Sequence, residues 1–158
     1  MEMTSRASVA GVSIREAETT DARRIAEILA AGSLHPGAED PTDPVPYAAV
    51  IGAFQRGPSS ILVAELDRRV VGVLQLLVFQ HLQRQGGICA ELESVHVDEE
   101  LRGRGIGGLL VEDAVRRAEQ LGCYRVQLTS NLRRVDAHRF YEAHGFTASH
   151  AGFKRDLG

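Results

Sequence analysis

Residues 101–108 form a glycine- and arginine-rich segment, LRGRGIGG, directly before a stretch with helical spacing. Its glycines let the backbone approach an anion closely, and the first turn of a helix presents free N–H groups at the positive end of its dipole. Arg102 and Arg104 can add charge-assisted hydrogen bonds to the same anion. The segment therefore predicts a phosphate-binding turn. The alternative is a flexible glycine turn with two solvated arginines.

Two well-known kinds of glycine-rich nucleotide site do not fit this segment. A Walker-type loop needs a lysine directly after its glycines, and the only lysine among the 18 basic residues is Lys154. A dinucleotide-binding turn lies in an early strand–helix–strand unit, and its next strand ends in an acidic residue. Here an antiparallel hairpin is expected before the segment, and the next strand ends in Thr129-Ser130-Asn131.

Hydrophobic spacing predicts the elements that must position this turn. Strands are expected over 12–16, 60–66, 70–79, 88–97 and 124–129, with one or two more over 146–153. Helices are expected over 21–31, 47–55, 106–121 and 136–144, and a proline-rich loop over 33–46. This order predicts one α/β domain over residues 1–158, with a flexible N-terminus over 1–11. Its sheet is antiparallel at first and includes a parallel crossover through the 106–121 helix.

Composition excludes several other classes of protein. The net charge of −3 over 158 residues argues against a general nucleic-acid binder. No apolar run approaches the roughly 20 residues of a membrane helix, and no signal-peptide segment is visible, so we expect a cytoplasmic protein. Cys89 and Cys123 have neither the number nor the spacing of a disulfide framework, and we expect reduced, buried thiols. The six histidines are scattered, so we predict no metal site.

The stretch ELESVHVDEELRGRGIGGLLVEDAVRRA resembles the central motif of the GNAT family of N-acetyltransferases. The family's pattern, Gln/Arg-x-x-Gly-x-Gly/Ala, is matched by Arg102-Gly103-Arg104-Gly105-Ile106-Gly107. The later RFYEAHGF, residues 139–146, resembles the family's Tyr-x-x-x-Gly-Phe signature. More loosely, the resemblance extends from about Ile14 to Phe153. It implies a mixed, mostly antiparallel central sheet flanked by helices, with a V-shaped splay between the fourth and fifth strands.

The resemblance also implies a binding site for acetyl-CoA at that splay. The residues it assigns to the cofactor are Val95, His96, Val97, Arg102, Gly103, Arg104, Gly105, Ile106, Gly107 and Asn131. Backbone groups of Val95 and Val97 would pair with the pantetheine arm, and the loop N–H groups would hold the pyrophosphate. Family members often carry an asparagine seven residues before the tyrosine. Arg134 stands there in this chain, and Asn131 is the nearest substitute.

Transfer of an acetyl group to an amine needs a neutral amine and protonation or stabilisation of the departing thiolate. Glu91 and Glu93 share a face in a regular strand, and either carboxylate could take the amine proton, directly or through water. Glu93 is preferred because it lies closer to the cofactor-pairing residues, and a bulge near this point would change which face reaches the site. Tyr141 is expected to protonate the thiolate. The alternatives are two solvated carboxylates and a core aromatic, and His96 is expected to pack under a helix.

These residues predict an acetyl-CoA-dependent N-acetyltransferase that acts on a small amine or a protein amino group. A catalytically silent acyl-CoA sensor and an unrelated anion-binding domain are the alternatives. The resemblance assigns acceptor specificity to residues 33–46 and the segment around 80–87, and an acidic first loop favours a cationic acceptor. It also leaves open a homodimer, because homodimers are frequent in the family. Neither the acceptor nor the use of acyl groups other than acetyl follows from the sequence.

Overall fold

The computed structural model of the protein describes residues 9–158, which contain one five-stranded sheet. Its strands are β1 (Val12–Glu16), β2 (Ser60–Leu66), β3 (Arg69–Gln80), β4 (Ile88–Val97) and β5 (Cys123–Leu128). They lie side by side in chain order; the first four pair antiparallel, and β5 runs parallel to β4. The predicted mixed, mostly antiparallel sheet is therefore confirmed.

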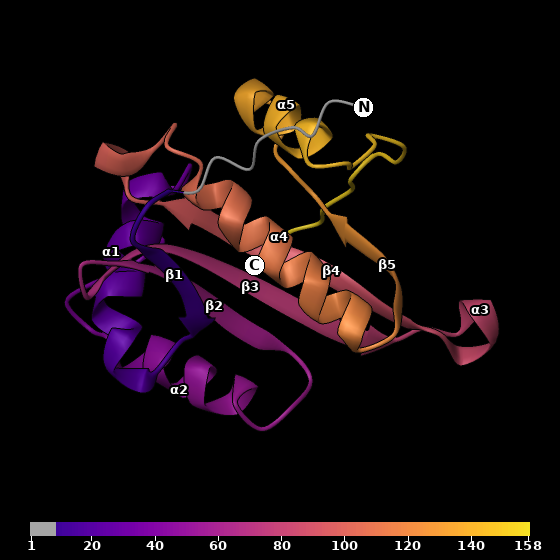
Figure 1. Ribbon diagram of the computed structural model, residues 1–158, viewed down its shortest axis with the longest axis horizontal. Coiled ribbons are helices and arrows are strands. Elements are labelled where there is room, and N and C mark those ends of the chain that lie inside the picture. The colour runs from indigo at the N-terminus through magenta and orange to yellow at the C-terminus, as the bar shows by residue number, and fades with distance from the viewer. Residues whose placement is uncertain (1–8) are drawn as a thin grey trace.

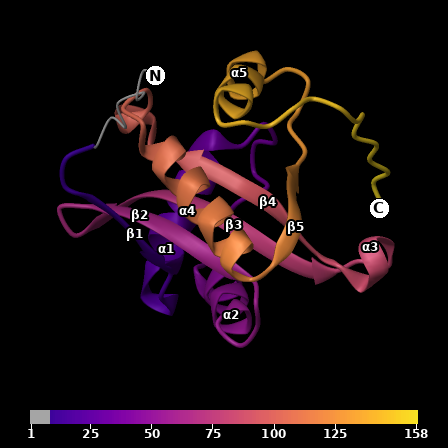
Figure 2. The same cartoon turned by 45° about the vertical axis from the view of Figure 1, so that its right-hand side comes forward.

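Helices cover both faces of this sheet (Figures 1 and 2). They are α1 (Ala22–Gly32), α2 (Val45–Phe54), α3 (Gln83–Gly86), α4 (Ile106–Gln120) and α5 (Val135–Ala143), with 3-10 turns at Thr19–Asp21 and Glu99–Leu101. Helix α4 lies on one face, whereas α1 and α2 lie on the other. Helix α5 stands beyond the end of β5 (Figure 1).

Each face has its own apolar core. On one side Ile106, Leu110 and Ala114 of α4 pack fully buried against sheet residues such as Leu74 and Leu92. Those α4 residues recur at a spacing of four, which is the spacing of one helix face. On the other side the buried residues are Ala17, Ala22, Ile25, Ile28, Ile51, Val63, Val70 and Val73. The sheet is thus apolar on both faces and holds helices on each.

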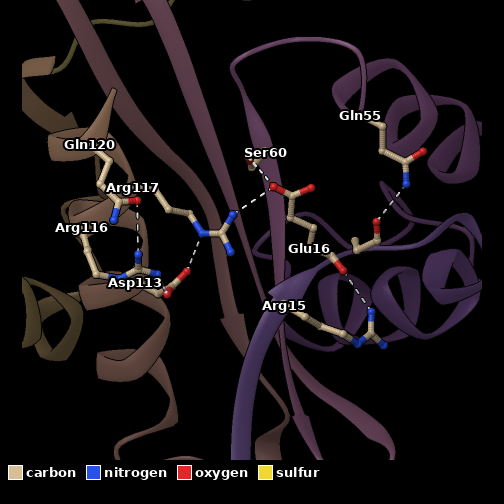
Figure 3. Close-up of polar contacts among 9 residues, drawn as sticks. Arg15, Glu16, Gln55, Ser60, Asp113, Arg116, Arg117 and Gln120 are labelled. Carbon is tan, nitrogen blue, oxygen red and sulfur yellow. Dashed lines mark hydrogen bonds and ion pairs between the residues drawn. The ribbon is translucent and has the colours of Figure 1, made fainter. Parts of the chain in front are cut away.

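An ion-pair network ties α4 to the first strand (Figure 3). Arg117 donates to Glu16 of β1 over 3.0 Å and to Asp113, one turn earlier in α4, over 2.6 Å. Because Arg117 is only about a quarter exposed, water screens these pairs less than fully exposed ones. The network joins the last turn of α4 to the edge strand β1.

Local turn chemistry explains the element boundaries. The β2–β3 hairpin turns on Asp67 and Arg68, both with positive φ (50° and 64°), the conformation that matches the twist of a two-residue hairpin. Helix α2 begins two residues before the predicted start at 47, because Pro46 occupies its first turn, where a missing N–H costs nothing.

The strand predicted over residues 146–153 is wrong. Residues 147–158 form no helix or strand, although Phe146 packs against the α4-side core. The side chains of 147–152 are small or polar, and Phe153 is 93% exposed. This segment therefore buries too little apolar surface to offset the entropy of ordering another strand. Of the predicted flexible N-terminus, residues 1–8 lie outside the described residues, whereas Val9 packs against the core.

Candidate active site

Strands β4 and β5 separate midway along β4, which is the predicted splay. Their paired residues run from Ile88 and Cys123 to Leu92 and Leu128, where β5 ends. Strand β4 continues to Val97 with β3 as its neighbour on one side, and no strand of residues 9–158 pairs with its other side beyond Leu92. The carbonyl oxygen of Val97 accepts from Arg102. The other backbone groups on that side of residues 93–97 can pair with an extended ligand, as in strand addition to a sheet edge.

A β-bulge at Ser94 decides which side chains face which layer. Val73 pairs with His96 and Gln75 with Glu93, so Ser94 and Val95 together oppose one residue of β3. Ser94 has φ 52°, a left-handed conformation that few residues other than glycine, asparagine or aspartate adopt. Without the extra residue, Glu93 and Val95 would share a face. With it, Val95 packs in the core under α4, and Glu93 faces the α1–α2 layer.

The two candidate bases share that α1–α2 face. Glu91 accepts a hydrogen bond from Gln127 of β5 (2.9 Å). Burial raises the pKa of Glu93, and the negative charge of Glu91 raises it further, while the positive charge of Lys154 opposes the shift. A carboxyl with a raised pKa is a better proton acceptor near neutral pH than an ordinary one. Of the two carboxylates, Glu93 has the environment of a general base.

Tyr141 projects from α5 on the far side of the splay. Its ring packs edge-to-face against Phe140 and Phe146, with centroid separations of 5.1 and 5.8 Å. Burial raises the pKa of its phenol; the charge of Glu93 adds to the shift, and the charge of Arg134 opposes it. The phenol therefore stays protonated at neutral pH and lies within electrostatic reach of Glu93. The three predicted catalytic side chains therefore influence one another, because the charge of Glu91 raises the pKa of Glu93 and the charge of Glu93 raises the pKa of Tyr141.

Arg134 bridges the two sides of the splay, a role that the sequence did not reveal. From the N-terminal end of α5 it donates to the carbonyl oxygen of Gly32, the last residue of α1 (2.7 Å). His96 packs beside the same glycine, as expected for a histidine under a helix: a Cβ on Gly32 would lie 2.3 Å from its Nδ1. Burial and the charges of Arg134 and Arg102 lower the pKa of His96, so it is neutral at pH 7.

The glycine-rich loop has the backbone conformation of an anion-binding turn. Gly103 and Gly105 have φ of 76° and 86°, and Gly105 is the residue before the first turn of α4. The four residues from Arg102 to Gly105 are exposed. The first turn of α4 has N–H groups that no intrahelical carbonyl can satisfy. These features fit a pyrophosphate at the start of α4.

The remaining loop residues contact the elements on either side of the loop. Arg104 is exposed beside the turn, while Arg102 donates to the carbonyl oxygen of Val97 at the end of β4 (3.3 Å). Ile106 is buried in the core, and a Cβ on Gly107 would contact Phe140 at 3.4 Å. These positions join the loop to β4 on one side and to α5 on the other.

Asn131 lies outside this group. Its side-chain oxygen accepts from the backbone N–H of Arg133 (2.9 Å), and its carbonyl oxygen accepts from the N–H of Arg134 (2.9 Å). The exposed side chain is therefore already used in the turn that precedes α5. Its predicted contact with the cofactor remains a prediction.

A cavity of about 350 Å³ lies between the α1–α2 layer and the sheet. Its lining comes from five parts of the chain: α1, the 33–46 loop, α2, β2–β3 and the bulge of β4. The lining residues are Ile25, Leu29, Glu39, Pro46, Tyr47, Val50, Ile51, Ile61, Val73, Gln75 and Ser94. The cavity reaches the bulge next to Glu93, so a molecule held in it lies beside the candidate base. The segment around residues 80–87, to which the resemblance assigned specificity, contributes nothing to this lining.

Both cysteines are free thiols, as predicted. Cys89 is fully buried and Cys123 half-buried, and neither lines the cavity. No helix within residues 9–158 has the length and hydrophobicity needed to cross a membrane.

A family comparison agrees with this geometry. The sequence profile of the acetyltransferase (GNAT) family matches residues 22–146, which is most of the chain. The chain belongs to the GNAT family. The resemblance seen in the sequence is thereby confirmed, and the match runs from the start of α1 to the end of the Tyr141 motif.

Relatives of this GNAT chain include enzymes named for phosphonate or phosphate compounds. It is 36% identical over 88 residues to the aminoalkylphosphonate N-acetyltransferase of Salmonella typhimurium, covering 56% of each chain. It is 34% identical over 89 residues to the glucosamine 6-phosphate N-acetyltransferase of Trypanosoma brucei brucei, covering 56% of this chain and 58% of that one. The GNAT chain thus spans little more than half the length of these curated relatives.

A solved structure matches the GNAT chain over nearly its whole length. The crystal structure of a transcriptional regulator from Bacillus halodurans C-125 superposes with a TM-score of 0.86 at 36% sequence identity. The superposition covers 92% of this chain and 99% of that one. The five-stranded arrangement with a parallel β4–β5 pair is therefore shared with a solved structure.

Proposed function

We propose that this GNAT domain transfers an acetyl group from acetyl-CoA to a primary amine, of a small molecule or a protein, by direct attack in a ternary complex. One observation carries the proposal. The open edge of β4 leads from Glu93 toward the glycine-rich loop at the start of α4, and Tyr141 on α5 lies within electrostatic reach of Glu93. That combination suits a thioester of CoA better than a simple anion.

The residues at the splay fit the parts of the cofactor. The N–H groups of the loop from Gly103 to Gly107, with Arg104 beside them, would hold the pyrophosphate. The free backbone edge at Val95 and Val97 would hydrogen-bond the pantetheine arm. When bound, acetyl-CoA supplies the acetyl group and a thiolate leaving group.

The two titratable residues then divide the proton transfers. Glu93 takes a proton from the amine, whose nitrogen forms the new bond to the acetyl carbon as the carbon–sulfur bond breaks. Tyr141 gives its phenolic proton to the departing sulfur and regains one from solvent. The environment of each group suits its role. The raised pKa of Glu93 makes its carboxylate a better base, and the raised pKa of Tyr141 keeps its phenol protonated so that it can act as an acid.

A second candidate is the acyl-CoA sensor. The similar structure from Bacillus halodurans is described as a transcriptional regulator, and the loop and the splay would bind acyl-CoA without any transfer. Catalysis is favoured by the position of Glu93, which pairs across the sheet with Gln75 of the cavity lining.

Two measurements separate these functions. Saturating acetyl-CoA, at about 100 times its Kd, should stabilise the protein by about 2.7 kcal/mol and raise its Tm by about 5–10 °C. No rise in Tm would exclude both the enzyme and the sensor. Free-thiol release with a panel of amines should then exceed the amine-free rate. Stabilisation by acetyl-CoA without any amine-dependent thiol release would favour the sensor.

A further inference from the structure

We infer that the acceptor of this enzyme is a small primary amine with a compact apolar body, such as an arylalkylamine, seated in the cavity beneath α1 and α2. The inference rests on the proposed acetyl transfer and names its second substrate. It concerns a different part of the molecule from the loop and splay that receive the cofactor.

The cavity wall is apolar along most of its extent. Residues from α1, α2 and the sheet, including Leu29, Ile51, Ile61 and Val73, present hydrocarbon surface, and Tyr47 adds an aromatic ring. A volume of about 350 Å³ lies at the small end of the range for ligand pockets. It has room for a phenyl ring or a short branched chain that carries the amine.

Helix α2 carries more apolar surface than the fold itself buries. All ten of its residues, VPYAAVIGAF, lack charge, yet Ile51 is its one fully buried residue. Val50 lines the cavity and is 45% exposed. A helix that is apolar all round is normally buried. An apolar ligand in the cavity would cover the inner part of this unburied surface.

The polar groups of the cavity mark where the amine would lie. Gln75 and Ser94 line one end, and Gln75 pairs directly across the sheet with Glu93. Residues directly opposite on neighbouring strands share a face with their Cβ atoms about 5 Å apart. An amine beside Gln75 is therefore within reach of the Glu93 carboxylate, while its apolar body extends beneath α2.

Charge within the cavity disfavours an anionic acceptor. Glu39 is the sole charged lining residue, and neither arginine nor lysine lines the cavity within the described chain. The phenol of Tyr47 donates to Glu39 over 2.6 Å and fixes that carboxylate at the wall. By contrast, Asp40 and Asp43 accept hydrogen bonds from their own turn. A phosphate or phosphonate here would meet a negative charge and no cation, whereas an ammonium would be attracted.

The test compares primary amines that differ in the size and charge of the group that carries the amine. Thiol release is measured at fixed acetyl-CoA with 2-phenylethylamine, ethylamine, O-phosphoethanolamine and glucosamine 6-phosphate. The kcat/KM for 2-phenylethylamine should exceed that for each of the others by about tenfold or more, because an apolar body in an apolar pocket contributes binding. Equal values for 2-phenylethylamine and ethylamine would overturn the inference, as would a preference for either phosphorylated amine.

A charge placed on α2 tests whether the acceptor binds in this cavity. Val50→Arg puts a cation at the cavity wall and should lower kcat/KM for 2-phenylethylamine at least tenfold while raising that for O-phosphoethanolamine. Ala49→Arg, the neighbouring exposed residue outside the lining, is the matched control and should change neither value. Equal effects of the two variants would refute this cavity as the acceptor site. If acetyl-CoA does not raise the Tm of the wild-type protein, the proposed transfer itself is refuted instead.

Discussion

Replacing Gly103 with alanine tests whether the loop before α4 holds the pyrophosphate. Gly103 has φ 76°, and a Cβ built on it meets no other atom within 4 Å. The cost to folding is therefore conformational alone, about 1–2 kcal/mol for an alanine held in the left-handed region. For a chain of this size that corresponds to a fall in Tm of about 2–8 °C.

Gly122, just after the other end of α4, offers a matched control. It has φ 78° and equally open space around a built Cβ, so Gly122→Ala should lower Tm by the same amount. It lies a whole helix away from the loop, about 20 Å at 1.5 Å per residue. The two variants thus share the folding cost and differ in their distance from the proposed phosphate site.

The two variants should differ in cofactor binding. In Gly103→Ala the added methyl and the shifted N–H groups cost at least one charge-assisted hydrogen bond, about 1.5–3 kcal/mol. The Kd for acetyl-CoA, measured by isothermal titration calorimetry, should then rise about 10- to 150-fold. In Gly122→Ala it should change by less than about twofold. An unchanged Kd in Gly103→Ala, or an equal rise in both variants, would refute the assignment of the loop to the pyrophosphate.

Substitutions at five positions test the candidate site. Glu93→Gln should lower kcat/KM about 10²–10⁴-fold and remove the acidic limb of the pH profile of kcat/KM. Glu91→Gln should keep that limb and move it to lower pH, because the negative charge of Glu91 raises the pKa of Glu93. An unaltered pH profile in Glu93→Gln would reassign the base. Tyr141→Phe should lower kcat at least tenfold with the acetyl-CoA Kd within twofold, and unchanged turnover would remove the phenol from the mechanism. Gly32→Ala, whose Cβ would lie 2.3 Å from His96, should destabilise the protein to urea by about 1–3 kcal/mol. Adding His96→Ala should restore most of that loss, and additive losses would contradict the packing described.

The strands and the loop could be predicted from the sequence because each has a strong local signal. Strand β4 spans the predicted 88–97, and α4 begins at Ile106 as expected, directly after a glycine with left-handed φ. In both places the apolar spacing changes abruptly at glycine or polar residues. The order of elements then follows from the hairpin and the crossover.

The features that complete the site lack such signals. Ser94 adopts a left-handed conformation that a serine in the sequence does not predict. Because of this extra residue, Glu93 and Val95 lie on opposite faces of the sheet. In the sequence, Arg134 is only the residue that stands where family members often carry asparagine. Its contact with Gly32 joins residues 102 positions apart, so no local pattern predicts it. The cavity combines five separate parts of the chain, so only the fold assembles it. The strand predicted over 146–153 is absent, because beyond Phe146 the segment has small or polar side chains and an exposed Phe153.

The proposed transfer is tested most directly by mass spectrometry of the acceptor. The wild-type protein is incubated with acetyl-CoA and an amine panel that includes 2-phenylethylamine, and the amide and free CoA are both quantified. The account predicts an acetylated amine that accumulates in a one-to-one ratio with free CoA, and that forms about 10²–10⁴ times more slowly in Glu93→Gln. Release of CoA without acetylated amine, or equal product from wild type and Glu93→Gln, would contradict it.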